Sequence, residues 1–309
     1  MTQQDGKWQF DRPLTNIVAG IKLNVPLFTY EPGDSTDYFD IGDKGITYCG
    51  TEVDCYDPLK VPTSSIFFLP FSSIAKSRSS DPVRISAELH TGPSWCESPR
   101  FHPNGSTIAF LGYPNKRALN PSIWVKYADS PHAVDVLGSF TGNTWHLVPE
   151  AFKFSPDGDT LFIQAQDSGR VALYRLDLVQ NTPPTPVLRV GSVTSFHALP
   201  PKKDRPTDLL ITSSSIVEPW YCQILQTGGG GVSEPRLISS ITQHINIGLS
   251  RSQVSETYFQ GAGDGTQRIH AWVIKPSYFD GTKKYPLCLH VHGGPYAAWN
   301  DAWSTRVCI

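Results

Sequence analysis

Two short phrases, Phe101-His102-Pro103-Asn104-Gly105 and Phe154-Ser155-Pro156-Asp157-Gly158, repeat one pattern 53 residues apart. In each phrase an aromatic residue is followed by one polar residue, then by Pro, by Asn or Asp, and by Gly. Pro fixes φ at about −65° in the first turn position, Asn or Asp tolerates the second, and Gly adopts the positive φ that closes a hairpin. Apolar runs precede and follow each phrase, so both phrases predict a β-hairpin.

Weaker copies of the same unit stand on either side of these two. The spacings are 62, 53 and 42 residues when the units are aligned on Phe39, Phe101, Phe154 and Phe196. Each unit holds about four short strands, and four antiparallel strands repeated every 40–60 residues or so are typical of β-propeller blades. A β-sandwich with coincidental turns is the alternative, and the missing Trp-Asp ending argues against WD-type blades. We therefore expect a mainly β chain with a partial propeller of about four blades over residues 1–245.

The composition fits such a fold and excludes several other classes of protein. The 309 residues include 25 Gly and 26 Pro, which break helices, and 15 Phe, 12 Tyr and 8 Trp, which supply a core. The net charge is −2 and no basic run exceeds two residues, which argues against nucleic-acid binding. No apolar stretch approaches the roughly 20 residues of a membrane span. The N-terminus lacks a signal-peptide pattern, so a complete chain would be cytoplasmic.

The cysteines give no sign of a metal centre. None forms a Cys-x-x-Cys pair and no His lies at metal-ligand spacing from one, so we predict no metal site, and no cofactor. The cysteines are Cys49, Cys55, Cys96, Cys222, Cys288 and Cys308. Cys49 and Cys55 could close a small disulfide loop, but free, partly buried thiols are the favoured interpretation. Cys288 lies in an apolar run, where we expect an inert packed residue.

The pattern changes in the C-terminal part, which we assign to a second domain at 246–309. Two predicted strands, 256–260 and 268–274, come first. They are followed by Leu287-Cys288-Leu289-His290-Val291-His292, a nearly continuous apolar run typical of a buried central strand. These segments predict the first strands of an α/β-hydrolase domain.

The apolar run ends in His292-Gly293-Gly294-Pro295. In an α/β-hydrolase, a strand that ends in His-Gly-Gly builds half of the oxyanion hole. Glycine lets the main chain approach the substrate closely, and a main-chain N–H can donate to the oxygen that becomes negative. Gly294 is the best candidate donor, with Gly293 beside it.

A propeller followed by the sequence at 285–306 resembles the prolyl oligopeptidase family of serine peptidases, most of all its fungal dipeptidyl-peptidase V branch. The resemblance implies a propeller that filters access to a hydrolase domain, peptide substrates, and secretion. It also implies a Ser-Asp-His triad that releases dipeptides from peptide N-termini through an acyl-enzyme. The mouth of the active site would include His292, Pro295 and Tyr296. In a secreted protein Asn104, in the sequon Asn-Gly-Ser, becomes a glycosylation candidate.

The triad itself is missing from the sequence. In this fold the nucleophile stands in a Gly-x-Ser-x-Gly elbow, followed by Asp and then His, and no Gly-x-Ser-x-Gly occurs in the 309 residues. The chain thus resembles a shortened family member, and we expect no peptidase activity from it alone. Two alternatives stay open: an acylaminoacyl-peptidase-like member of the same family, and a propeller that only binds a partner. The oligomeric state is not predicted.

Three other polar or aromatic positions have two interpretations each. Asp301 and Trp303 follow the glycine motif and line either the active-site mouth or the surface. Glu218 is either an acidic anchor for a peptide amine or, as we prefer, a plain loop carboxylate. His292 is not expected to be the catalytic base, because the family places its base near the far C-terminus.

Overall fold

The structure is a computed structural model of the chain. It describes residues 2–4, 7–9, 23–24, 38–52, 63–72, 82–86, 93–114, 120–140, 145–180, 182–200, 207–227, 234–245, 247–262, 266–293 and 298–304. Regular structure in these segments is almost entirely β-strand. None of the helical segments in this described part is long and apolar enough to cross a membrane.

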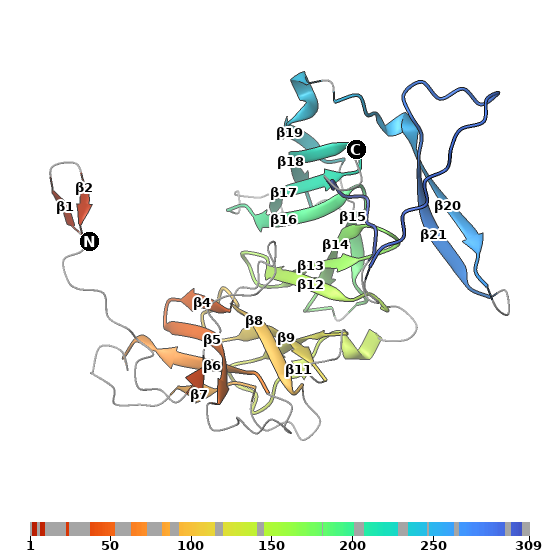
Figure 1. Cartoon of the computed structure of the whole chain (residues 1–309). Helices are drawn as coiled ribbons and strands as arrows, with labels where there is room; N and C mark the ends of the chain where they lie inside the picture. The colour runs from red at the N-terminus through yellow and green to blue at the C-terminus, as the bar shows by residue number, and fades with distance from the viewer. Residues whose placement is uncertain are drawn as a thin grey trace. The chain divides into compact units, whose positions relative to one another are not determined.

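Four antiparallel sheets follow one another along the chain, in the strand order expected of propeller blades (Figure 1). The first contains β3 (Leu23–Asn24), β4 (Phe39–Gly42), β5 (Gly45–Glu52), β6 (Ser65–Pro70) and β7 (Val83–Arg84). The second contains β8 (Trp95–Phe101), β9 (Ile108–Tyr113), β10 (Ser122–Lys126) and β11 (Val134–Asp135). The third contains β12 (Pro149–Phe154), β13 (Thr160–Gln166), β14 (Val171–Asp177) and β15 (Thr185–Leu188). The fourth contains β16 (Ser192–Ala198), β17 (Asp208–Ser215), β18 (Glu218–Gln226) and β19 (Arg236–Ser240).

The described segments also contain two hairpins and three short 3₁₀ turns. The hairpins pair β1 (Thr2–Gln4) with β2 (Lys7–Gln9), and β20 (Val254–Gln260) with β21 (Arg268–Ile274). The 3₁₀ turns are η2 (Gly138–Phe140), η3 (Thr242–His244) and η4 (Arg251–Gln253). The β20–β21 hairpin confirms the first two strands predicted for the C-terminal part.

The repeated phrases form the predicted turns. Gly105 has φ +65° between β8 and β9, and Gly158 has φ +84° between β12 and β13. The four aligned phenylalanines lie on β4, β8, β12 and β16. Each unit of the sequence repeat therefore corresponds to one sheet, and the predicted blade-like organisation is confirmed.

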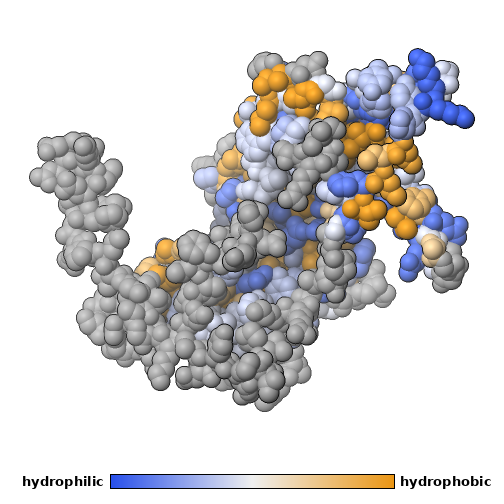
Figure 2. Space-filling model, in the orientation of Figure 1, coloured by the Kyte–Doolittle hydropathy of each residue, from blue (hydrophilic) through white to orange (hydrophobic). Residues whose placement is uncertain are grey.

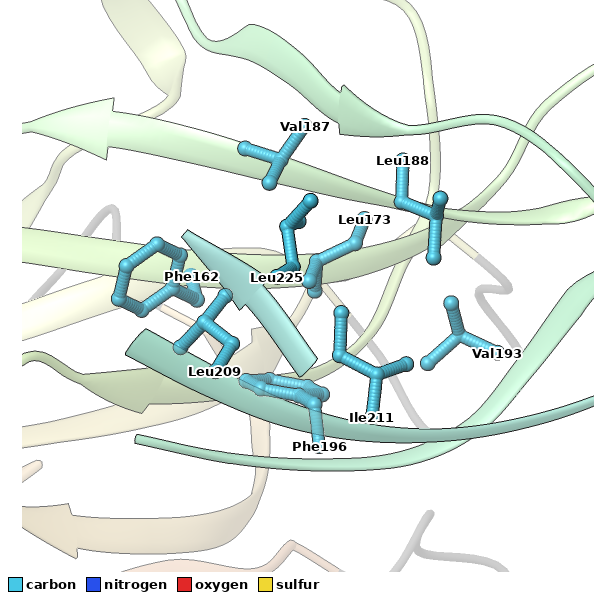
Figure 3. Close-up of a cluster of buried hydrophobic side chains, with 9 residues drawn as sticks. All are labelled: Phe162, Leu173, Val187, Leu188, Val193, Phe196, Leu209, Ile211 and Leu225. Carbon is cyan, nitrogen blue, oxygen red and sulfur yellow. The ribbon is translucent and has the colours of Figure 1, made fainter. Parts of the chain in front are cut away.

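The main hydrophobic core described lies between the third and fourth sheets. Strands β13, β14 and β15 supply part of it and strands β16, β17 and β18 the rest (Figure 3); the residues are Phe162, Leu173, Val187, Leu188, Val193, Phe196, Leu209, Ile211 and Leu225. Alternate residues of a strand point to the same face, so the third and fourth sheets present apolar faces to each other.

The chain divides into two compact units. The first consists of Met1–Phe101, Gly105–Arg117 and Val125–Val134, and the second of His102–Asn104, Ala118–Trp124 and Asp135–Ile309. The first has a core of its own around Tyr48, Phe67 and Leu69. The third sheet, the fourth sheet and the β20–β21 hairpin all belong to the second unit. The limits 1–245 and 246–309 remain a prediction for the propeller and hydrolase parts.

The third strand predicted for the hydrolase part is wrong. Residues 284–293 have no regular secondary structure, and Leu287, Leu289 and Val291 are 91%, 80% and 71% exposed. Apolar residues gather on the surface in this part of the molecule (Figure 2). A central strand needs hydrogen-bonding neighbours and cover on both faces, and no strand in the described segments pairs with this run.

The thiols divide into buried and exposed groups. Cys49, Cys96 and Cys222 are free and buried, which confirms the favoured interpretation for these three. Cys288 is free but exposed, so the expectation of a packed residue is wrong, for the same reason as the strand around it. Cys55, the other half of the predicted disulfide alternative, lies outside the described residues.

Candidate functional site

The predicted oxyanion turn is described only in part. His292 and Gly293 are exposed, and the Nδ1 atom of His292 lies 2.9 Å from the carbonyl oxygen of Gly293. Gly294, Pro295 and Tyr296 lie outside the described residues. The assignment of Gly293 and Gly294 as oxyanion donors therefore remains a prediction.

The chain is anchored again a few residues after this turn. The indole N–H of Trp272 on β21 donates to the carbonyl oxygen of Trp299 at 3.0 Å. The backbone N–H of Asp301 donates to the carbonyl oxygen of Gly169 at 2.7 Å, and that of Trp303 to the hydroxyl of Ser214 at 3.3 Å. The segment after the glycine motif is thus hydrogen-bonded to the third sheet, the fourth sheet and the β20–β21 hairpin.

Asp301 is the most buried charged group of this segment, with no exposed surface. Its Oδ1 atom accepts the backbone N–H of Ile216 at 3.0 Å and a guanidinium N–H of Arg251 at 2.8 Å. Its Oδ2 atom is buried without a hydrogen-bond partner in the described structure. Of the two predicted locations for Asp301, a surface position is therefore wrong, while Trp303 is half-buried.

A second charged group ties the β20–β21 hairpin to the β13–β14 turn. Arg170 in that turn forms an ion pair with Glu256 on β20 at 2.5 Å, and the guanidinium lies 4.9 Å from the centre of the Trp272 ring. Glu256 also accepts the hydroxyl of Tyr258 at 2.9 Å and lies 3.1 Å from Nε2 of His270. We use the name junction for one set of residues: Arg170, Arg251, Glu256, Tyr258, His270, Trp272 and Asp301.

The close approach at the junction depends on one glycine. Gly169 has φ +71°, and a Cβ atom there would lie 2.4 Å from Cε1 of His270. Only glycine combines the left-handed backbone with the missing side chain. The tip of the third sheet is therefore shaped to receive the aromatic side chains of β21.

The ion pair gives the junction a pH dependence. Hydrogen bonding to Arg170, above all, lowers the pKa of Glu256 from its ordinary 4.5 to about 2. Because the folded-state pKa is the lower one, the stabilisation is complete above about pH 4.5 and is lost as the pH falls towards 2. We expect the difference in urea midpoint between the native chain and Glu256→Gln to shrink over this range. Urea unfolding curves from pH 6 down to about pH 2.5 measure it.

The variant Arg170→Met tests whether the ion pair with Arg170 causes this pH dependence. In that background the effect of Glu256→Gln on the urea midpoint is expected to depend much less on pH, because Tyr258 and His270 still lower the pKa of Glu256 but the largest cause is gone. A difference that persists in full in the native chain at pH 2.5 would show that Glu256 does not titrate with the junction.

Two other residues singled out from the sequence, Glu218 and Asn104, form local hydrogen bonds. The carboxylate of Glu218 accepts the backbone N–H of Thr242 at 3.3 Å and also its hydroxyl. Glu218 is the first residue of β18, so its predicted loop position is wrong, while its partner at Thr242 is structural. Asn104 is exposed in the β8–β9 turn, and its backbone N–H lies 3.0 Å from Nδ1 of His102. No metal-binding group of His, Cys, Asp and Glu occurs among the described residues.

Comparison with solved structures shows which known proteins share this fold. The chain superimposes on the acylaminoacyl peptidase of Pyrococcus horikoshii with a TM-score of 0.58 and 15% identity, covering 86% of this chain and 36% of that one. It superimposes on dipeptidyl peptidase 4 of Porphyromonas gingivalis with a TM-score of 0.50 and 15% identity, covering 84% and 34%. At this level of identity the likeness concerns the fold alone.

Sequence comparison gives closer relatives. Dipeptidyl-peptidase 5 of Trichophyton schoenleinii is 31% identical over 99% of this chain, and dipeptidyl-peptidase 5 of Aspergillus fumigatus is 34% identical over 68% of it. The chain belongs to the prolyl oligopeptidase family. Within that family it is similar to these fungal dipeptidyl-peptidases 5, and it spans 41% and 28% of the length of the two relatives. No family model matches the chain.

Proposed function

We propose that this chain is the propeller and oxyanion-bearing part of a serine dipeptidyl-peptidase, which releases dipeptides from the N-termini of peptides. The observation that carries the proposal is 31% identity to a dipeptidyl-peptidase 5 over 99% of the chain. The sequence His292-Gly293-Gly294-Pro295 supports it. Residues 1–245 would filter access to the active site, and residues 246–309 would begin the hydrolase domain.

The chemistry assigned to these residues is electrostatic. When a serine attacks the peptide carbonyl, its oxygen becomes negative, and the N–H of Gly294, supported by Gly293, would donate to it. His292, Pro295 and Tyr296 would stand at the mouth of the site. The serine, aspartate and histidine of the triad are not assigned to any residue here, because the 309 residues contain no Gly-x-Ser-x-Gly.

Secretion belongs to the same proposal. A chain that enters the secretory pathway would present Asn104 to the glycosylation machinery, and the exposed β8–β9 turn is a favourable place for a glycan. Peptide substrates are the proposed partners.

The test joins the chain, at Ile309, to the triad-bearing C-terminal part of the Trichophyton schoenleinii relative. The fusion is expected to release nitroaniline from a dipeptide nitroanilide with a free N-terminus, whereas the 309-residue chain alone releases none. A serine acyl-enzyme needs the nucleophile and base that only the fusion contains.

A second substrate separates the alternatives. An acylaminoacyl-peptidase-like member, the alternative within the family, would prefer an N-acetylated amino-acid nitroanilide. A propeller that only binds would cleave neither substrate even in the fusion. Cleavage by the isolated chain would contradict the proposal directly.

A further inference from the structure

Asp301 stands at a place where three parts of the second unit meet. Its backbone N–H bonds to Gly169 in the β13–β14 turn, and its carboxylate accepts the N–H of Ile216 in the β17–β18 turn. The same carboxylate binds Arg251 in η4, immediately before β20. One buried residue therefore connects the third sheet, the fourth sheet and the start of the hairpin.

We propose that Asp301 is a positioning residue that holds the segment after His292-Gly293-Gly294-Pro295 on the turns of the third and fourth sheets. The second half of the inference rests on the proposed function: by holding this segment, Asp301 sets where the oxyanion donors lie. It would not touch the substrate.

Hydrogen bonds on both sides of Asp301 attach the same short segment. Trp299, two residues before it, accepts the indole N–H of Trp272, and Trp303, two residues after it, donates to Ser214. The residues between 299 and 303 are therefore attached at three successive points, with the buried carboxylate at the middle one. Without the carboxylate, the backbone of this segment keeps its hydrogen bonds at residues 299, 301 and 303. It loses the two bonds to Ile216 in the β17–β18 turn and to Arg251 in η4.

The buried carboxylate of Asp301 is paired with a guanidinium group. A buried charge is costly unless it is paired, and Arg251 supplies the pair at 2.8 Å. The hydrogen bond to Glu256, above all, raises the pKa of Arg170, and the nearby charge of Asp301 adds to this effect. Arg251 lies 5.8 Å from the centre of the Trp272 ring and Arg170 lies 4.9 Å from it. The carboxylate thus balances two guanidinium groups that pack against the same indole.

The first test uses the 309-residue chain and amide hydrogen exchange. In Asp301→Ala, the Ile216 amide loses its acceptor, and we expect its exchange to accelerate about tenfold or more, together with the amides of residues 301 and 303. The Leu209 and Ile211 amides in the core should change by less than about twofold. Unchanged exchange at Ile216 would overturn the inference.

Two milder variants keep the test decisive if Asp301→Ala does not fold. Asp301→Asn keeps an acceptor for Ile216 but loses the charge, and Arg251→Gln removes the same ion pair from the other side. Each is expected to accelerate exchange at residues 301 and 303, and the double variant no more than either alone, because both remove one interaction. Additive effects would overturn the role of the pair. Asp280→Asn, which changes a partly exposed carboxylate that precedes the glycine motif, is the matched control and should leave these amides unchanged.

The second test uses the fusion that carries the triad. Asp301→Asn is expected to lower kcat about tenfold while KM changes less than twofold, because a displaced donor weakens binding of the transition state rather than of the substrate. A fusion that is active but indifferent to Asp301→Asn would overturn the catalytic half of the inference. An inactive unsubstituted fusion would count against the proposed function instead, and the exchange experiment would still decide whether Asp301 holds the segment.

Discussion

Replacing Phe196 with alanine is expected to lower the free energy of unfolding of the second unit by about 3–5 kcal/mol. Phe196 is 2% exposed and lies on β16 among apolar side chains of the third and fourth sheets (Figure 3). Its removal loses the transfer free energy of the ring and leaves a cavity that the two sheets cannot fill without moving. Urea unfolding of the chain, followed by tryptophan fluorescence, measures the loss.

The matched control for this prediction is Phe259→Ala. Phe259 lies on β20 and is 49% exposed, so the same change of side chain removes little buried surface. We expect a loss of about 1 kcal/mol or less. Equal losses for the two variants would mean that the contact between the third and fourth sheets is not the core of the unit.

The blades could be predicted because their turns are local chemistry. The φ of a turn glycine depends on its immediate neighbours, so Pro-Asn-Gly and Pro-Asp-Gly predict the hairpin turns that contain Gly105 and Gly158. Strand alternation around the aligned phenylalanines adds a second local signal. Neither signal depends on what lies elsewhere in the chain.

The run 287–292 could not be judged in the same way. Its apolar residues show that it suits a buried strand, but hydrogen-bonding neighbours and cover are properties of the surrounding structure. In the described structure those neighbours are lacking and Leu287 is almost fully exposed. The same dependence explains the error at Cys288.

The junction also escaped prediction, because its partners are distant in sequence. Arg170 and Glu256 are 86 residues apart, and Asp301 and Ile216 are 85 apart. A single sequence gives no signal that pairs such positions. Asp301 drew attention only because it follows the glycine motif, and its burial and its partners come from the structure alone.

Replacing Gly294 with proline in the fusion is expected to lower kcat about 10²–10³-fold, with little change in KM. Proline has no N–H, so the variant removes the donor assigned to the developing oxyanion, a loss of about 2.7–4 kcal/mol in transition-state stabilisation. The ground-state carbonyl is bound less strongly by such a donor, which is why the effect falls on kcat. Steady-state kinetics with a dipeptide nitroanilide measure it.

Two variants separate the donor from the backbone that carries it. Gly294→Ala keeps the N–H and should lose far less activity than the proline variant, unless the backbone there adopts a positive φ that only glycine tolerates. Gly293→Pro places the same ring one residue earlier and leaves the assigned N–H in place. A loss in Gly293→Pro that exceeds the loss in Gly294→Pro would move the assignment to Gly293, and full activity in Gly294→Pro would refute an oxyanion role for this N–H. The order of the three variants therefore identifies which amide of the His-Gly-Gly-Pro turn faces the oxyanion.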